Sequence, residues 1–254
     1  MKICVCFKIV PDLDQVLSAD WENVTNGLDI SYVKKIYNCF DEGALEMALS
    51  LKDAFGEAAV SCTAVTVGEG LATLMKGLYA VGFDRVVRLE AEDREFCPEQ
   101  IAAVLKNFIK SEGFDLVFTG MQAGMADSGM VPPMLSELLG WPVISDAVNL
   151  TVDEGALTVN TLSHDRAETI KFTGPAVIMV GDAERPYLRI PNLREKMAAS
   201  KCEIESVTPI LAPMAEPLTF YRDITEKNCH WIAGEQDADK ATSLYRQLIE
   251  EVRT

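Results

Sequence analysis

The sequence predicts an α/β fold, with a doubly wound and mostly parallel sheet, an antiparallel hairpin and an extended C-terminal arm. Three observations support this prediction. Before Pro142, apolar runs alternate with helical runs of about 10–15 residues, which is the pattern of βαβ units. The fourth apolar run ends in a glycine-bearing segment, Gly120–Gly129, where a strand passes into a helix. After Pro142 the pattern changes to the alternation that is typical of antiparallel strands.

Four apolar runs separated by helices predict the parallel part of the sheet. The first helix begins after Asn38 and buries an apolar stripe between Ala44 and Leu51. Asp41 and Glu42 lie in its first turn, where the helix dipole favours anions. The predicted strands are Ile3–Val10, Ala59–Val67, Arg85–Leu89 and Asp115–Thr119, and the helices that follow them begin near Asn38, Gly70, Cys97 and Ser128.

Two segments depart from the parallel pattern. Residues 13–33 are mostly polar and include the turn pair Asn26-Gly27, so they are predicted to form a hairpin or an excursion from the sheet. Ala147–Val152 and Ala156–Leu162 alternate around Asp153-Glu154-Gly155, which predicts an antiparallel hairpin. The strand pattern continues in Glu168–Phe172 and in the strongly apolar run Ala176–Val180.

The C-terminal part of the chain contains a loop, an arm and a helix. Arg185–Arg194 carries apolar residues flanked by cations, so it is either an ordinary connector or a recognition loop with an apolar anchor. Residues 203–218 contain three prolines and no steady period. Such an arm rarely packs on its own domain, so we expect it to embrace another subunit. Ala238–Val252 is predicted to be a helix with Leu244 and Leu248 on its apolar stripe.

Composition excludes several classes of protein. The 254 residues carry a formal net charge of −16, which argues against nucleic acid as a partner. No apolar run approaches the length of a membrane span, and the N-terminus is interpreted as a first strand. Two histidines are too few for a histidine-based metal centre. The seven cysteines form no Cys-x-x-Cys pair and several lie in apolar strands, which favours reduced thiols and a cytoplasmic location.

No set of catalytic residues emerges from the sequence. It lacks a nucleophile elbow, a lysine-bearing P-loop and metal-ligand spacing. Gly120–Gly129 instead offers backbone N–H groups at a strand-to-helix junction, where α/β proteins often bind a phosphate. An ordinary βα turn explains the glycines equally well. Asp127 or Ser128 is the expected cap of the helix that follows.

Four segments carry a pattern that occurs together in one family: Cys6–Asp12, Asn38–Glu46, Gly120–Pro142 and Arg185–Lys201. In this order and spacing they resemble the β subunit of electron transfer flavoprotein, over nearly the whole chain. The first is similar to the opening strand of the family and the second to its asparagine-proline-aromatic segment. The third is similar to its Gly-(Lys/Arg)-Gln-Ala loop and helix. The fourth is similar to its recognition loop and basic tail.

The resemblance implies the β subunit of a heterodimeric electron carrier with no bond-making catalytic residues of its own. The α subunit holds the redox-active FAD, and the pair carries electrons between flavin dehydrogenases, such as acyl-CoA dehydrogenases, and an acceptor. The β subunit binds an adenine nucleotide, which is AMP in most members and a second FAD in members that bifurcate electrons. Residues 1–200 are then the adenine-nucleotide-binding α/β domain, and residues 201–254 are an arm and helix that contact the partner subunit.

Carried over residue by residue, the resemblance implies two sites. In the recognition loop, Ile190 takes the position of the apolar anchor that inserts into the dehydrogenase. The residues implied for partner recognition are Tyr187, Leu188, Ile190, Pro191 and Leu193. The residues implied for the nucleotide pocket are Cys6, Asn38, Cys39, Phe40, Val67, Gly120, Gln122, Ala123, Asp127 and Ser128.

The sequence departs from the family in the nucleotide loop. Met121 replaces a lysine or arginine, Cys39 replaces a proline, and Pro132 replaces a glycine. Because methionine packs well on planar rings, we favour FAD over AMP as the bound nucleotide. Asn38 has two possible roles, to bind an adenine edge or to fix its own loop. A homodimeric adenine-nucleotide-binding protein like the universal stress proteins is the alternative, although such proteins lack the loop and arm that follow Tyr187.

Overall fold

The computed structural model describes residues 1–17, 19–20, 30–56, 58–68, 70–91, 97–124, 128–153, 156–164, 166–211, 229 and 231–252. These residues belong to two compact units, and each unit is described by itself. The larger unit contains every described residue up to 211. The smaller unit contributes residues 229 and 231–252.

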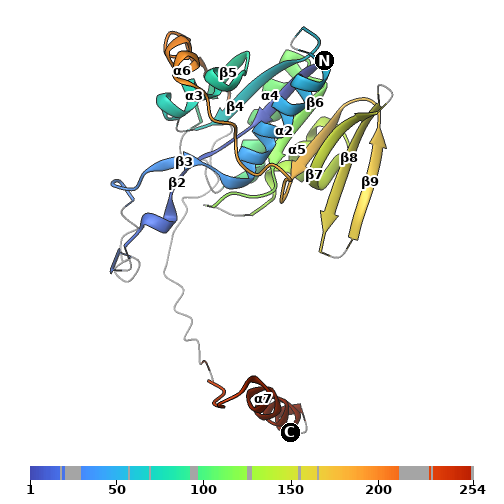
Figure 1. The fold of residues 1–254 in the computed structure, drawn as a ribbon. Helices are drawn as coiled ribbons and strands as arrows, with labels where there is room; N and C mark the ends of the chain where they lie inside the picture. Colours follow the sequence, from blue (N-terminus) through green and yellow to red (C-terminus); the bar gives the residue numbers. More distant parts are fainter. Residues whose placement is uncertain are drawn as a thin grey trace. The chain divides into compact units, whose positions relative to one another are not determined.

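Among the described residues, a nine-stranded sheet forms the centre of the larger unit (Figure 1). Its strand order is β11-β5-β4-β1-β6-β10-β7-β8-β9. Neighbouring strands from β11 to β7 are parallel, and β8 and β9 extend the sheet with antiparallel pairs. The predicted doubly wound sheet with an antiparallel hairpin is therefore confirmed. The strands are β1 Lys2–Cys6, β4 Ser61–Val67, β5 Arg85–Leu89, β6 Leu116–Gly120, β7 Val143–Asp153, β8 Ala156–Ser163, β9 Arg166–Phe172, β10 Ala176–Val180 and β11 Glu205–Val207.

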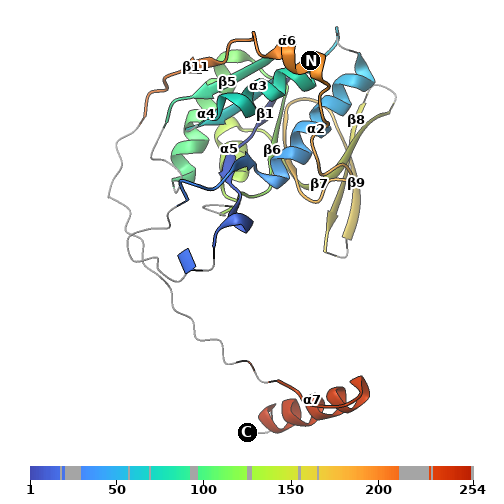
Figure 2. The same cartoon turned by 60° about the vertical axis from the view of Figure 1, so that its left-hand side comes forward.

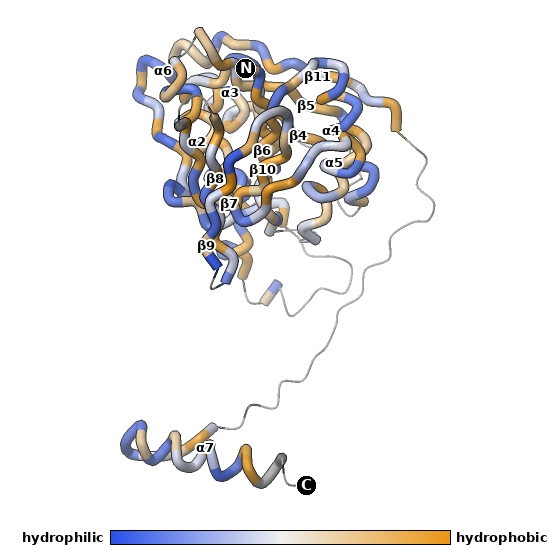
Figure 3. Tube along the Cα trace, turned by 90° about the vertical axis from the view of Figure 1, so that its right-hand side faces the viewer, coloured by the Kyte–Doolittle hydropathy of each residue, from blue (hydrophilic) through white to orange (hydrophobic). Residues whose placement is uncertain are grey.

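Helices cover both faces of the parallel part of the sheet (Figure 2). Alternate residues of β1 point to opposite faces, so Ile3 joins one buried cluster and Cys4 joins the other. In Figure 3, the apolar colour is concentrated in the central strands β4, β6 and β10, where the two clusters meet the sheet. Helices α2 (Cys39–Phe55) and α3 (Ala72–Val81) belong to the first cluster, and α4 (Pro98–Glu112) and α5 (Val131–Leu139) to the second.

The predicted first strand Ile3–Val10 is divided into two strands. β1 ends at Cys6, and β2 (Ile9–Pro11) pairs antiparallel with β3 (Lys35–Tyr37) in a separate small sheet. The chain leaves the large sheet because the Lys8 N–H donates to the Asp41 carboxylate of α2 at 2.7 Å instead of to a neighbouring strand. A 3-10 helix, Leu13–Gln15, follows β2. The β2–β3 pair agrees with the predicted excursion, whereas Asn26-Gly27 lies outside the described residues.

The expectation that the arm leaves its own domain is wrong for its first residues. β11 pairs in parallel with β5 at the edge of the sheet, and the Glu90 N–H donates to the Val207 carbonyl at 2.9 Å. Arg85 fixes this strand through a 2.8 Å ion pair with Glu205. The helix α6 (Leu193–Ala199) precedes β11, and the Lys76 ammonium of α3 donates to the Ser200 carbonyl at its end. In the smaller unit, α7 (Asp237–Val252) agrees with the predicted C-terminal helix.

Candidate functional site

The carboxyl ends of β1 and β6 mark the point where the winding of the sheet reverses. From β1 the chain continues to β4 and β5 on one side, and it then crosses to β6 on the other side of β1. In open α/β sheets, ligands bind in the crevice outside such a reversal. The first turn of α2 and the loop after β6 meet at these two strand ends. The structure therefore brings the predicted Asn38 and Gly120 segments together.

Asn38 fixes the loop that follows β6. Its side chain is buried, with 1% exposed. The amide Nδ2 donates to the Gln122 carbonyl at 2.7 Å, and Oδ1 accepts from the Gly124 N–H at 3.3 Å. Since both ends of the amide are bonded to the loop after β6, Asn38 fixes that distant loop and not its own, which neither of the two predicted roles described.

Asp41 joins the two strand ends to α2. Its Oδ2 accepts from the Lys8 N–H at 2.7 Å, and its Oδ1 accepts from the Gly120 N–H at 3.0 Å. Burial raises the pKa of this carboxyl to about 7, although the hydrogen bonds from Lys8, Gly120 and Asn38 and the charge of Lys8 act in the opposite direction. A residue larger than glycine at position 120 would not fit, because its Cβ would overlap the Asp41 carboxylate.

Most residues of the predicted pocket lie along this edge of the sheet. The strand ends supply Cys6 and Val67, and the first turn of α2 supplies Cys39 and Phe40. Asp127 lies outside the described residues. The segment after β6 supplies the others, namely Gly120, Gln122, Ala123 and Ser128.

The start of α5 differs from the prediction. The helix begins at Val131, and its N-cap residue Met130 makes no capping hydrogen bond through its side chain. The expected cap, Ser128, accepts the Met130 N–H through its hydroxyl at 3.3 Å. Pro132 and Pro133 lack N–H groups, so two of the donors that a helix usually offers to an anion are absent here.

The turn before α5 supplies donors that the helix lacks. The backbone N–H groups of Ser128, Gly129 and Val131 form no hydrogen bond with another described residue. Gly129 is left-handed, with φ 60°, and Met130 is right-handed. Alternation of the two hands turns successive N–H groups towards one side, which is the geometry of an anion-binding nest. The residues present thus fit a phosphate held by the turn and not by the first turn of the helix.

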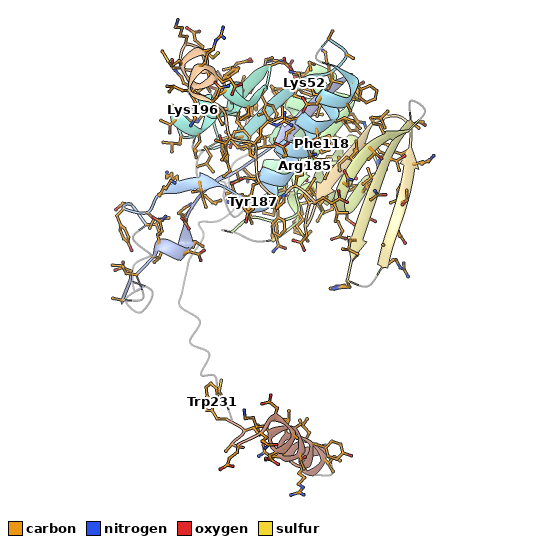
Figure 4. All side chains as sticks on the ribbon, viewed as in Figure 1. Lys52, Phe118, Arg185, Tyr187, Lys196 and Trp231 are labelled. Carbon is orange, nitrogen blue, oxygen red and sulfur yellow. The ribbon has the colours of Figure 1, made fainter. Side chains whose placement is uncertain are left out.

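A second group of predicted residues lies in the segment between β10 and α6. Tyr187, Ile190 and Leu193 are 78%, 89% and 74% exposed. Leu188 instead packs against the core, and Pro191 is half-buried. Figure 4 shows the labelled side chains of Arg185 and Tyr187 on this segment beside α2. Three of the five residues predicted for partner recognition are therefore exposed apolar side chains, and the other two pack partly on the protein.

Sequence analysis missed the acidic residues that hold these segments in place. Asp41 was assigned only a favourable position at the helix dipole, and Glu46 and Arg189 received no role. No local signal marks Glu46, because its helical spacing places it on the side of α2 opposite the apolar stripe, where a charge is ordinarily solvated. Glu46 is nevertheless only 4% exposed, because the segment after β10 packs on that side. The sequence gives no indication that its partner is Arg189, which is 143 residues away.

The described residues contain neither the arrangement of a metal site nor a disulfide. No cluster of histidine, cysteine or acidic side chains among them has the arrangement of a metal site. All seven cysteines are free thiols, in agreement with the prediction of reduced cysteines. None of the described helices is long and apolar enough to cross a membrane.

Comparisons with known proteins identify relatives along most of the chain. The sequence model of the electron transfer flavoprotein domain matches residues 26–212. The chain is 28% identical over 255 aligned positions to YgcR of Escherichia coli K12, which is named as an electron transfer flavoprotein subunit, and the alignment covers 98% of each chain. It is 32% identical over 212 positions to the electron transfer flavoprotein subunit beta of Bradyrhizobium diazoefficiens, with 82% of each chain covered.

Proposed function

The chain belongs to the electron transfer flavoprotein β-subunit family, and from this premise we propose that it works as one half of a heterodimeric electron carrier. Its partner is an α subunit that holds the redox-active FAD. The pair accepts electrons from a flavin dehydrogenase and passes them to an acceptor. The family match includes the segment between β10 and α6. We therefore set aside the alternative of a homodimer like the universal stress proteins, which would lack this segment.

The second part of the proposal is an adenine nucleotide at the carboxyl ends of β1 and β6. The observation that carries it is the loop after β6, which Asn38 and Asp41 hold over the sheet reversal through three hydrogen bonds. The N–H groups of the turn at Gly129 that bond to no other described residue fit a phosphate. Methionine in place of a cationic residue at position 121 makes the loop more apolar, which supports FAD in preference to AMP.

A bound flavin would supply one- and two-electron chemistry, whereas AMP would be structural. The residues of this chain would bind and orient the nucleotide in either case. Val67 and Cys6, at the ends of their strands, would border the nucleotide on the sheet side, and Phe40 would border it from the first turn of α2. The phosphate would lie against the turn at Ser128–Val131.

Nucleotide analysis of the purified heterodimer tests this proposal. The α–β complex is denatured with acid, and the released FAD and AMP are counted per heterodimer by chromatography and absorbance. We expect two FAD, or one FAD with one AMP. One FAD without AMP would refute the nucleotide site, and two FAD would justify stepwise reduction experiments for electron bifurcation.

The surfaces for the two protein partners are proposed on separate parts of the chain. The exposed residues around Ile190 are assigned to the flavin dehydrogenase. The C-terminal helix is assigned to the α subunit, because Leu244, Tyr245 and Leu248 are 45%, 65% and 51% exposed and lack a core within the described part of their own unit. Gel filtration of the chain with and without a co-expressed α subunit tests this assignment. A stable homodimer of the isolated chain would contradict it.

A further inference from the structure

A polar stripe on α2 holds the segment that carries Ile190. Glu42, Glu46, Ser50 and Asp53 recur three or four residues apart, so they lie on one side of the helix. The segment that follows β10 packs against this side. A Cβ on Gly43 would be only 3.0 Å from the Ala183 Cβ, which shows how closely the segment approaches the helix.

Glu46 makes the strongest contacts of this stripe. Its carboxylate accepts the Arg189 backbone N–H at 3.0 Å and receives the Arg189 guanidinium at 2.8 Å from Nη2 and at 3.0 Å from Nε. Asp53 pairs with the other side of the same guanidinium at 2.9 Å. One turn earlier, Glu42 accepts the Leu188 N–H at 3.1 Å. Because Glu46 is only 4% exposed, this pair is shielded from solvent on the side of the carboxylate.

The residues on both sides of Ile190 are therefore fixed. Arg189 precedes it and is held by α2. Asn192 follows two positions later and forms a reciprocal capping box with Glu195 at the start of α6, through hydrogen bonds of 2.7 and 3.0 Å. Ile190, which is 89% exposed, projects from a short segment that is bonded to the protein at each end.

The helix that carries this stripe is itself fixed at both ends. Asp41 joins its first turn to β1 and β6. Near its last turn, the buried Lys52 ammonium donates to the Gly82 carbonyl at 2.9 Å and pairs with Asp84 at 2.8 Å. The position of Ile190 relative to the sheet is thus fixed through one rigid helix, α2.

We infer that Glu46 is a positioning residue for dehydrogenase docking, which acts by holding Arg189 so that Ile190 is ordered before the partner arrives. The inference rests on the proposed function, in which Ile190 contacts the dehydrogenase. Ordering a segment in advance lowers the entropy that is lost on binding, so it improves affinity without adding any contact. Loss of the Glu46 carboxylate should then weaken docking even though Glu46 itself touches no partner.

The test uses the heterodimer of Glu46→Gln with its α subunit and the flavin dehydrogenase that reduces the wild-type heterodimer. We expect the KM for the heterodimer to rise about tenfold, because docking would then have to order one side chain and its loop that the wild type holds in place beforehand. The value of kcat should stay within about twofold, because saturation restores docking, and the nucleotide content should not change. A purely structural role of Glu46 would lower the melting temperature but leave KM of the folded protein at its wild-type value.

Limited trypsin digestion reports on the same ion pair without the dehydrogenase. Trypsin cleaves after a free arginine, so cleavage after Arg189 should be slow in the wild type and at least tenfold faster in Glu46→Gln. Cleavage after the exposed Arg194 serves as the internal reference. Equal cleavage rates after Arg189 in both proteins would overturn the inference.

Controls separate this inference from a general effect of charge. Glu168→Gln breaks the exposed 3.6 Å pair with Arg166 on β9 and should leave KM unchanged. If Glu46→Gln does not fold, Arg189→Met removes the same ion pairs from their half-buried cationic partner and should raise KM similarly, with Arg166→Met as its control. An unchanged KM in Arg189→Met refutes the inference. If no flavin dehydrogenase reduces the wild-type heterodimer, the proposed function fails, and the trypsin result still decides whether Glu46 orders the segment.

Discussion

The substitution Gly120→Ala tests whether the edge of the sheet depends on the contact between β6 and α2. The added Cβ would overlap the Asp41 carboxylate and lie 2.9 Å from the Phe40 Cβ and 3.0 Å from the Asp41 nitrogen. Overpacking of this kind costs about 1–3 kcal/mol. Displacement of Asp41 also weakens its hydrogen bond to the Gly120 N–H, which contributes about 1.5–3 kcal/mol when the acceptor is charged. We expect the free energy of unfolding to fall by about 3–5 kcal/mol.

Urea unfolding followed by circular dichroism measures this loss, and Gly124→Ala is the matched control. Gly124 lies in the same loop, but no atom lies within 4 Å of the position of its added Cβ. The control should be neutral or slightly stabilising, because alanine reduces the entropy of the unfolded chain. The melting temperature of Gly120→Ala should drop by roughly 6–20 °C, at about 2–4 °C per kcal/mol for a domain of this size. Equal unfolding midpoints for the two variants would refute the reasoning.

Three further predictions concern single side chains. Ile190→Ala should weaken dehydrogenase docking by about 1–2 kcal/mol and leave the nucleotide content unchanged, and an unaltered KM for the heterodimer would contradict the anchor role. Because the Asp41 pKa is raised from 3.8 to about 7, the folded protein retains a proton there that the unfolded chain has already released. The contribution of Asp41 to stability is therefore present at low pH and is lost as pH rises towards 7, by at most about 1.4 kcal/mol per pH unit. Urea unfolding midpoints measured from about pH 4.5 to 8 should change less with pH in Asp41→Asn than in the wild type. The buried hydroxyls of Thr119 and of Thr158 on β8 have no partner among the described residues. Thr119→Val and Thr158→Val should therefore each raise the free energy of unfolding by about 1 kcal/mol. A loss of stability in both variants would show that these hydroxyls are bonded.

Local pattern was sufficient to predict the elements of the fold. The strands β1, β4, β5, β6 and β10 are short apolar runs, and the helices between them carry a stripe of period 3.6, so the two kinds of element differ in their apolar pattern. β5 and β10 have the predicted bounds, and Gly82 and Gly140 end their helices in the left-handed conformation that favours glycine. The predicted hairpin is also present, as β7 and β8.

The local patterns fail where contacts between residues distant in the sequence determine the structure. Nothing near Lys8 in the sequence indicates that the first strand stops there, because its N–H is taken by Asp41, 33 residues further on. Likewise, the prolines of residues 203–218 predict an arm without regular structure. Glu205–Val207 nevertheless pairs with β5 at the edge of the sheet. The sequence shows prolines at positions 132 and 133. Only the structure shows that the helix begins at Val131, so that these prolines remove two N–H donors from its first turn.

The sequence by itself therefore determined the architecture and, through the order of four segments, the family of the protein. The tertiary structure alone decided what the acidic residues of α2 do. Their spacing places Asp41 in the first turn and Glu46 on the polar side of the helix, which indicates neither that they are buried nor which residues they bind. The partners, Gly120 for Asp41 and Arg189 for Glu46, lie 79 and 143 residues away, and only the folded chain brings them within hydrogen-bond distance.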